Sequence, residues 1–210
     1  MTTSYSIAIQ GGGSSIQQQI VRSGDSTPNI AVSLPAGKAG TLSTRTDNNT
    51  GVATVASGHG ITTSDVVSAY WSGGRRYGMT VTATDSTTIS VDGGSGDNLP
   101  TQGVSIVVSK EIAANLLLDG DNAKLVAVSF EVATSSASKC RATFFDAVAG
   151  GGSAVGSGLE LTANAPSITD IEGGATNIYT GSPILSVVAS NGDSSSAATL
   201  KIIAEVDATP

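Results

Sequence analysis

The feature that most constrains this chain is a succession of short runs in which apolar residues alternate with polar or small ones. Residues 4–10 are an example, because Tyr5, Ile7 and Ile9 occupy alternate positions before the triple glycine at 11–13. A period of two places successive side chains on opposite faces of a β-strand, and glycine ends the run. The pattern therefore predicts an all-β fold made of short strands.

The same pattern recurs to the end of the chain. Further strands are predicted over residues 16–22, 29–34, 41–44, 52–55, 66–71, 77–81, 88–91, 104–108, 123–132, 139–147, 159–161, 176–179, 184–189 and 197–206. Residues 111–118 have good helix propensity but form a short segment, so both a strand and a helical turn stay open for them. The last two runs flank the turn residues 191–193 and are predicted to pair as a terminal hairpin.

Glycine and proline clusters mark two borders in the chain and suggest an insertion. Between the borders, residues 41–103 read as a meander of short strands, which is typical of a small barrel. The N-terminal flank supplies three strands, too few for a stable sheet sandwich by itself. We therefore predict a jelly-roll-like β-sandwich built from 1–40 and 104–210, with a small β-barrel of residues 41–103 inserted into it.

Composition excludes several classes of function. Charged residues make up 13% of the chain, against roughly 25% in soluble domains, which is typical of a surface packed against copies of itself or a partner. The net charge of −7 argues against nucleic acid as a partner. The single cysteine, Cys140, excludes an intramolecular disulfide and is expected in the core. We also expect no signal peptide and no membrane span.

Residues 57–84 hold the only histidine, the only tryptophan and a pair of adjacent arginines. His59 could act as a general base if Ser57, Ser64 or Asp65 lay within hydrogen-bond reach. No Gly-x-Ser-x-Gly motif lies near it, and a turn residue whose imidazole caps a loop is the more common explanation for such a histidine. We adopt the second interpretation, and predict no catalytic residue and no enzymatic activity.

Two acidic loops resemble parts of calcium sites. Residues 92–98 and 119–122 combine closely spaced carboxylates and amides, which supply the hard oxygen ligands that calcium prefers. Neither loop has the terminal glutamate or the full spacing of an EF-hand, and turn formation explains both. We predict no metal and no cofactor, and calcium binding by these loops stays open.

One cluster of side chains is a candidate contact surface for a partner or a glycan. It consists of Tyr70, Trp71, Arg75, Arg76 and Tyr77, which the predicted hairpin brings together. Aromatic rings stack on sugars and bases, and arginine stacks on aromatic rings. In an acidic protein, such a pair of arginines is more often solvated or in contact with another subunit than bound to phosphate.

Three segments of the central region carry a resemblance to a known module. These are residues 58–67, 74–81 and 87–94, in which a His-Gly-hydrophobic turn with a following aspartate leads into a strand. They resemble a small β-barrel module of tailed-bacteriophage virion proteins, which is similar to the FCCH barrel of ubiquitin-activating enzymes. The resemblance covers about a third of the chain and concerns a fold more than a function. Residues 42–51 and 94–100 also resemble structural proteins of phages and prophages.

The resemblance implies a component of the virion, made in the host cytoplasm. Our first expectation is a capsid decoration or cement protein, a homotrimer that binds the major capsid protein or other virion proteins. On a lattice, weak contacts that are repeated many times add up through multivalency. The alternative is a tail or fibre module that binds a host glycan. Neither expectation involves nucleic acid or a membrane as a partner.

Overall fold

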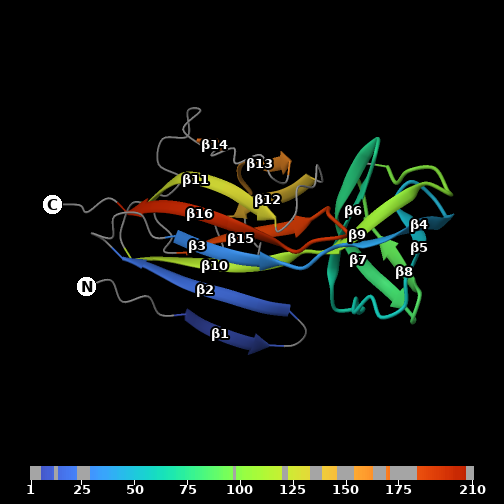
Figure 1. The fold of residues 1–210 in the computed structure, drawn as a ribbon, viewed down its shortest axis with the longest axis horizontal. Helices are drawn as coiled ribbons and strands as arrows, with labels where there is room; N and C mark the ends of the chain where they lie inside the picture. Colours follow the sequence, from blue (N-terminus) through green and yellow to red (C-terminus); the bar gives the residue numbers. More distant parts are fainter. Residues whose placement is uncertain are drawn as a thin grey trace. The chain divides into compact units, whose positions relative to one another are not determined.

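The chain folds as an all-β protein. A computed structural model describes residues 6–11, 14–22, 29–96, 98–119, 123–132, 139–145, 154–162, 169–170 and 184–206. Every regular element in these ranges is a β-strand (Figure 1). The predicted class, a β-sandwich with a small β-barrel, is confirmed. No helix long and apolar enough to cross a membrane occurs among the described residues.

The chain divides into two compact units, each made of segments that are separate in sequence. The sandwich unit contains Met1–Leu34, Ile112–Ala189 and Ala198–Pro210, and the barrel unit contains Pro35–Glu111 and Ser190–Ala197. The barrel is therefore inserted between parts of the sandwich in sequence. The barrel unit also receives eight residues from near the C-terminus.

The sandwich unit contains two sheets. The first has the order β1 (Ser6–Gly11), β2 (Ser14–Arg22), β10 (Ile112–Asp119), β15 (Ile184–Asn191), β12 (Lys139–Phe145), β13 (Ala154–Thr162). The second has the order β14 (Thr169–Asp170), β11 (Ala123–Val132), β16 (Ala198–Val206), β3 (Asn29–Leu34). The N-terminal strands pair with later ones, since β2 lies parallel to β10 and β3 antiparallel to β16. Cys140 is buried in β12 without a disulfide, as predicted.

The predicted terminal hairpin of 184–189 and 197–206 is wrong. The two runs are strands, but β15 lies between β10 and β12 in one sheet, whereas β16 lies between β11 and β3 in the other. Because both edges of each strand are already paired, neither has an edge left for the other. The open choice for 111–118 is settled, since this segment is the strand β10. The predicted strand at 176–179 lies outside the described residues.

The barrel unit is a closed six-stranded barrel. Its strands are β4 (Lys38–Arg45), β5 (Thr50–Val55), β6 (Val66–Trp71), β7 (Gly74–Thr84), β8 (Thr88–Asp92) and β9 (Ser105–Lys110), in the spatial order β4-β5-β8-β7-β6-β9. Pairing of β9 with β4 closes the barrel. The predicted insertion spans 41–103, and the two closing strands extend this region to 38 and 110. The predicted hairpin of 66–71 with the return strand is confirmed as β6 and β7.

Alternating apolar side chains fill the inside of the barrel. Buried members of this core are Leu42, Ala53, Val55, Ile61, Val67, Ala69, Met79, Val81, Ile89, Val91, Leu99, Ile106 and Val108. Strand β8 shows the period of two clearly, because Ile89 and Val91 are buried and their neighbours are less so. Burial of such side chains contributes about 25 cal/mol per Å² of apolar surface. The core therefore fixes the register on which the loop geometry depends.

Candidate functional site

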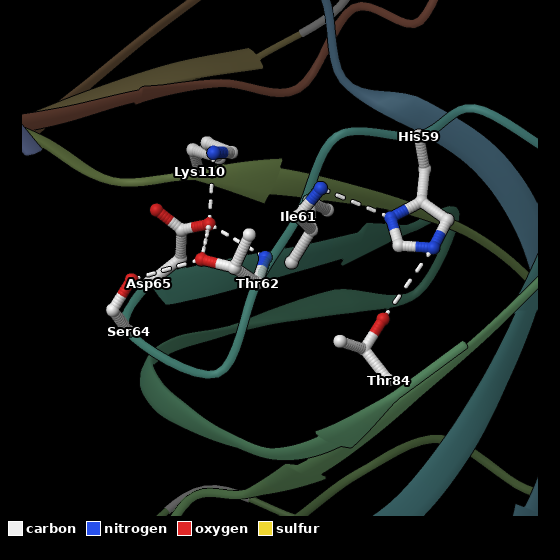
Figure 2. Close-up of polar contacts among 7 residues, drawn as sticks. All are labelled: His59, Ile61, Thr62, Ser64, Asp65, Thr84 and Lys110. Atoms are coloured by element: carbon white, nitrogen blue, oxygen red, sulfur yellow. Dashed lines mark hydrogen bonds and ion pairs between the residues drawn. The ribbon is translucent and has the colours of Figure 1, made fainter. Parts of the chain in front are cut away.

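The imidazole of His59 holds two loops of the barrel together (Figure 2). Its Nδ1 atom accepts a hydrogen bond of 3.0 Å from the backbone N–H of Ile61. Its Nε2 atom lies 2.7 Å from the carbonyl oxygen of Asp85. A carbonyl oxygen only accepts, so Nε2 carries the proton and the ring is the neutral tautomer that donates from Nε2. Both ring nitrogens thus serve the fold.

Asp65 lies at the other end of the same β5–β6 loop that contains His59. Its carboxylate accepts hydrogen bonds from the backbone N–H of Thr62 at 2.7 Å and from the Thr62 hydroxyl at 3.0 Å. The Nζ atom of Lys110 lies 2.8 Å from the same oxygen. Asp65 is 5% exposed, so the loop N–H group and the lysine compensate its buried charge. These contacts fix the turn that leads into β6.

The residues of a possible catalytic triad are not brought together. Figure 2 shows His59 on one side of Ile61 and Asp65 with Ser64 on the other. The hydrogen bonds described for the imidazole go to Ile61, Asp85 and, at 3.5 Å, to the Thr84 hydroxyl. The interpretation of His59 as a turn residue that caps a loop is confirmed by these bonds. Its chemistry here is that of a hydrogen-bonding clamp.

We expect His59→Ala to lower the free energy of unfolding by about 2 kcal/mol, because one buried and one partly buried backbone group lose their partner. The groups are the Ile61 N–H and the Asp85 carbonyl oxygen. Urea denaturation followed by Trp71 fluorescence measures the effect. The matched control is Ser57→Ala, at an exposed position of the same loop, for which we expect a change within about 0.5 kcal/mol. Equal effects of the two variants would contradict the clamp.

The glycine-rich loop after β8 surrounds the side chain of Arg76. This arginine is buried, at 6% exposed, and its Nη2 atom donates hydrogen bonds to the backbone oxygens of Gly93 and Ser95. A Cβ atom built at Gly93 or Gly96 would lie 2.5 Å from the guanidinium group. A side chain at either position would displace the guanidinium group, and Gly96 also has a φ of 124° that favours glycine.

Arg76 also bears on the calcium interpretation of the 92–98 loop. The carbonyl oxygens of Gly93 and Ser95 are hard ligands of the kind that calcium uses, and here they accept from the guanidinium group. The Asp92 carboxylate accepts the N–H of Gly94 and forms a turn. Among the described residues, no group of three or more acidic, histidine or cysteine side chains could hold a metal. Residues 120–122 of the second acidic loop lie outside the described residues.

The candidate contact residues of the β6–β7 hairpin occupy different depths. Tyr70 and Arg76 are buried, Trp71 and Tyr77 are half-buried, and Arg75 is exposed. The Tyr70 and Tyr77 rings meet edge to face with centroids 5.8 Å apart. The Arg75 guanidinium carbon lies 5.9 Å from the centre of the Tyr77 ring, and Trp71 packs partly on the barrel core. A contact surface here would consist of Trp71, Arg75 and Tyr77.

A buried chain of hydroxyl groups escaped the sequence analysis. Tyr70 Oη lies 2.6 Å from Ser190 Oγ, which donates to Ser68 Oγ at 2.9 Å. Ser68 Oγ in turn donates to Glu111 Oε1 at 2.7 Å, an atom that also accepts the N–H of Gly78. The chain ties β6 to the segment Ser190–Ala197. The one available signal was Ser68, a serine that interrupts the apolar run of β6.

Two exposed aspartates, Asp47 and Asp85, close loops of the same design. In each case Oδ1 accepts hydrogen bonds from the backbone N–H groups two and three residues later. The N···O distances are 2.7 Å for three of these bonds and 2.8 Å for the bond from Thr88 to Asp85. These bonds lower the pKa of both carboxyl groups below the ordinary value of 3.8. The largest contribution comes from the backbone N–H two residues later. The ionised form is therefore favoured in the folded chain.

We expect this preference to make stability depend on pH in the acid range. A carboxyl group whose pKa is depressed by folding stabilises the fold above its unfolded pKa, here about 3.8, and loses that contribution as the pH falls through the folded pKa. Unfolding by urea between pH 7 and pH 2 should show a loss that begins near pH 4. The variant Asp47→Asn with Asp85→Asn should lose less stability over that window. Identical pH profiles would refute the prediction.

Comparison of the chain with models of protein families, with curated proteins and with solved structures gave no match in any of the three searches.

Proposed function

We propose that this chain is a non-enzymatic structural protein of a phage virion, a capsid decoration or cement protein that acts as a homotrimer. In this role it binds the major capsid protein or other virion proteins and stabilises the shell through subunit contacts. The proposal starts from the sequence resemblance of residues 41–100 to a virion barrel module and from the low charge of the chain. A single structural observation carries it further.

That observation is the use that the barrel makes of its polar side chains. His59, Asp65 and Arg76 are all buried, and each binds backbone groups of the barrel's own loops. Polar side chains that hydrogen-bond to loop backbone in this way hold the loops in one conformation. A rigid body needs little ordering when it docks, so more of its contact energy remains as affinity. These properties suit a protein that binds by shape.

The outer face of the barrel supports the same role. Thr54, Thr80 and Thr82 are exposed on β5 and β7, and Val66 on β6 is 39% exposed. These side chains are uncharged and β-branched, so they lose little rotamer freedom on contact with a partner. Contacts made at these four positions do not require an ion to be desolvated. Repetition over a capsid lattice would multiply modest contacts.

The test measures oligomeric state and particle binding with the full chain. Light scattering should give three times the chain mass of 20.7 kDa, and the chain should co-sediment with expanded capsids. The variant Thr80→Lys with Thr82→Lys puts charge on the proposed face and should weaken sedimentation without changing the melting temperature. Thr63→Lys, at an exposed turn position, is the matched control. A monomer that does not bind capsids would remove the proposal.

A second candidate function is a tail or fibre module that binds a host glycan. It is favoured by the exposed Arg75, which lies over the Tyr77 ring, and by the half-buried Trp71 on the same hairpin. A glycan array with the full chain tests it. Signal that is lost in Arg75→Ala and in Trp71→Ala would establish this function. Capsid binding without any glycan signal would leave the first proposal alone.

A further inference from the structure

The segment Ser190–Ala197 contains the only asparagine of the chain that is followed directly by glycine, Asn191–Gly192. Asparagine is among the thermally labile residues of proteins. In a flexible Asn-Gly pair, the glycine N–H is unhindered because glycine has no Cβ atom, so its nitrogen can reach the asparagine side chain. This pair is therefore the position at which the chain most readily modifies itself.

The reaction needs only water in addition to the chain. The backbone nitrogen of Gly192 forms a bond to Cγ of Asn191, the Cγ–Nδ2 bond breaks, and ammonia leaves with the proton of the glycine nitrogen. Water then opens the cyclic imide at either carbonyl and yields aspartate or isoaspartate at position 191. No oxidation or reduction takes place. The product exchanges an amide, which donates hydrogen bonds, for a carboxylate, which only accepts them.

The folded barrel unit holds Asn191 in a way that opposes this reaction. The side chain is 1% exposed. Its Nδ2 atom donates to the backbone oxygens of Ser196 at 2.8 Å and Pro35 at 3.3 Å, and its Oδ1 atom accepts the N–H of Asp193 at 2.9 Å. Attack by Gly192 requires the amide to rotate and to release both Nδ2 bonds. Nδ2 must also gain a proton to leave as ammonia, and the Ser196 and Pro35 carbonyl oxygens next to it cannot donate one.

Further bonds keep the segment docked. The backbone oxygen of Asn191 accepts the Ser109 hydroxyl, and the N–H of Gly37 donates to the Asp193 oxygen at 2.7 Å. The Tyr70 hydroxyl lies 2.6 Å from Ser190 Oγ. All of these groups belong to the barrel unit. Release of the segment therefore breaks several bonds at once and behaves as a local opening.

We propose that Asn191–Gly192 is a latent self-modification site, gated by docking of the segment Ser190–Ala197 in the barrel unit. While the segment is docked, the amide is locked and the chain keeps its asparagine. Each opening exposes the pair to cyclisation. After the reaction, the carboxylate at 191 faces the Ser196 and Pro35 carbonyl oxygens, and like partial charges prevent the segment from docking again. Chains modified at this site therefore accumulate with each opening and do not return to the docked form.

The experiment follows the modification in the full chain by mass spectrometry of peptides that contain residue 191. At mildly alkaline pH, the conversion rate of the native chain should be lower than that of the chain in urea by a factor of about ten or more. Tyr70→Phe removes one docking bond and leaves the Asn-Gly pair intact, so it should speed conversion in the native chain and not in urea. Ser57→Ala, at an exposed loop position of the barrel unit, is the control and should convert at the wild-type rate.

Two further variants test the remaining steps. Gly192→Ala should slow conversion in urea, because a methyl group hinders the attacking nitrogen. Asn191→Asp mimics one product and should melt at a lower temperature than the wild type. Equal conversion rates in native and urea samples, or an unchanged native rate in Tyr70→Phe, would overturn the gating. A wild-type melting temperature for Asn191→Asp would overturn the block on docking.

Discussion

Replacing Arg76 with alanine is expected to lower the free energy of unfolding by about 3 kcal/mol, because hydrogen bonds from a buried charged group are among the strongest in proteins. The variant leaves the backbone oxygens of Gly93 and Ser95 without their donor and empties the space inside the loop after β8. Loss of the donor to these carbonyl oxygens and loss of packing act in the same direction. Urea denaturation at neutral pH measures the sum.

The neighbouring arginine provides a control of identical chemistry. Arg75 is exposed and stacks on Tyr77, and because contacts of exposed charged side chains are weak, Arg75→Ala should cost less than about 1 kcal/mol. Arg76→Lys should recover only part of the loss, because an ammonium group lacks the planar fork that fits between two carbonyl oxygens. Similar losses in Arg75→Ala and Arg76→Ala would show that the loop does not depend on the guanidinium group.

Gly40→Ala should be nearly as damaging, with an expected loss of about 3 kcal/mol from overpacking. Gly40 lies on β4, opposite Val55 on β5 and Ile106 on β9. A Cβ atom at this position would lie 2.3 Å from the backbone oxygen of Thr54 and 2.7 Å from a methyl group of Val55. Because the nearest atom belongs to the backbone, the strand itself has to move. The variant should therefore lower the melting temperature markedly.

Gly73→Ala is the matched control for this substitution. At Gly73, in the turn between β6 and β7, the added carbon would meet the Trp71 ring at 3.7 Å, an ordinary van der Waals distance. Glycine to alanine at a compatible position reduces the entropy of the unfolded chain and stabilises by about 0.4–1 kcal/mol. The two variants should thus shift the melting temperature in opposite directions. A loss at both positions would refute the packing explanation.

Local signals predicted the strands well where a turn or an alternating pattern is strong. The strands at 29–34 and 123–132 have the bounds that their apolar pattern indicates, and the hairpin of β6 and β7 follows from the tight turn at Ser72 and Gly73. The predicted pairing of β15 with β16 was wrong for a physical reason. A short polar connection allows two successive strands to pair as a hairpin, and it also allows the second strand to enter another sheet. Which of the two occurs depends on the other strands that compete for the same edges.

The candidate site was less predictable than the fold. The capping role of His59 followed from its glycine neighbours and the absence of a catalytic motif. Arg76 was treated together with Arg75, because sequence alone does not tell which of two adjacent arginines points inward. The register places Asp92 opposite Thr80. Because β8 is antiparallel to β7, the glycine-rich loop after Asp92 lies near the start of β7, where Arg76 is found. The signal that would have identified this contact is a glycine-rich loop that follows one strand of a pair, together with an arginine on the other strand.

The eight-residue segment from Ser190 to Ala197 has a consequence for synthesis on the ribosome. The last barrel strand ends at Lys110, but the Tyr70 hydroxyl and the N–H of Gly37 find their partners in residues 190 and 193. During translation, residues 35–111 emerge long before these partners exist. Domains normally fold in the order in which they are made. Here the earlier unit completes its hydrogen bonds only after translation has passed residue 193, so a product that ends before residue 190 carries an unfinished barrel.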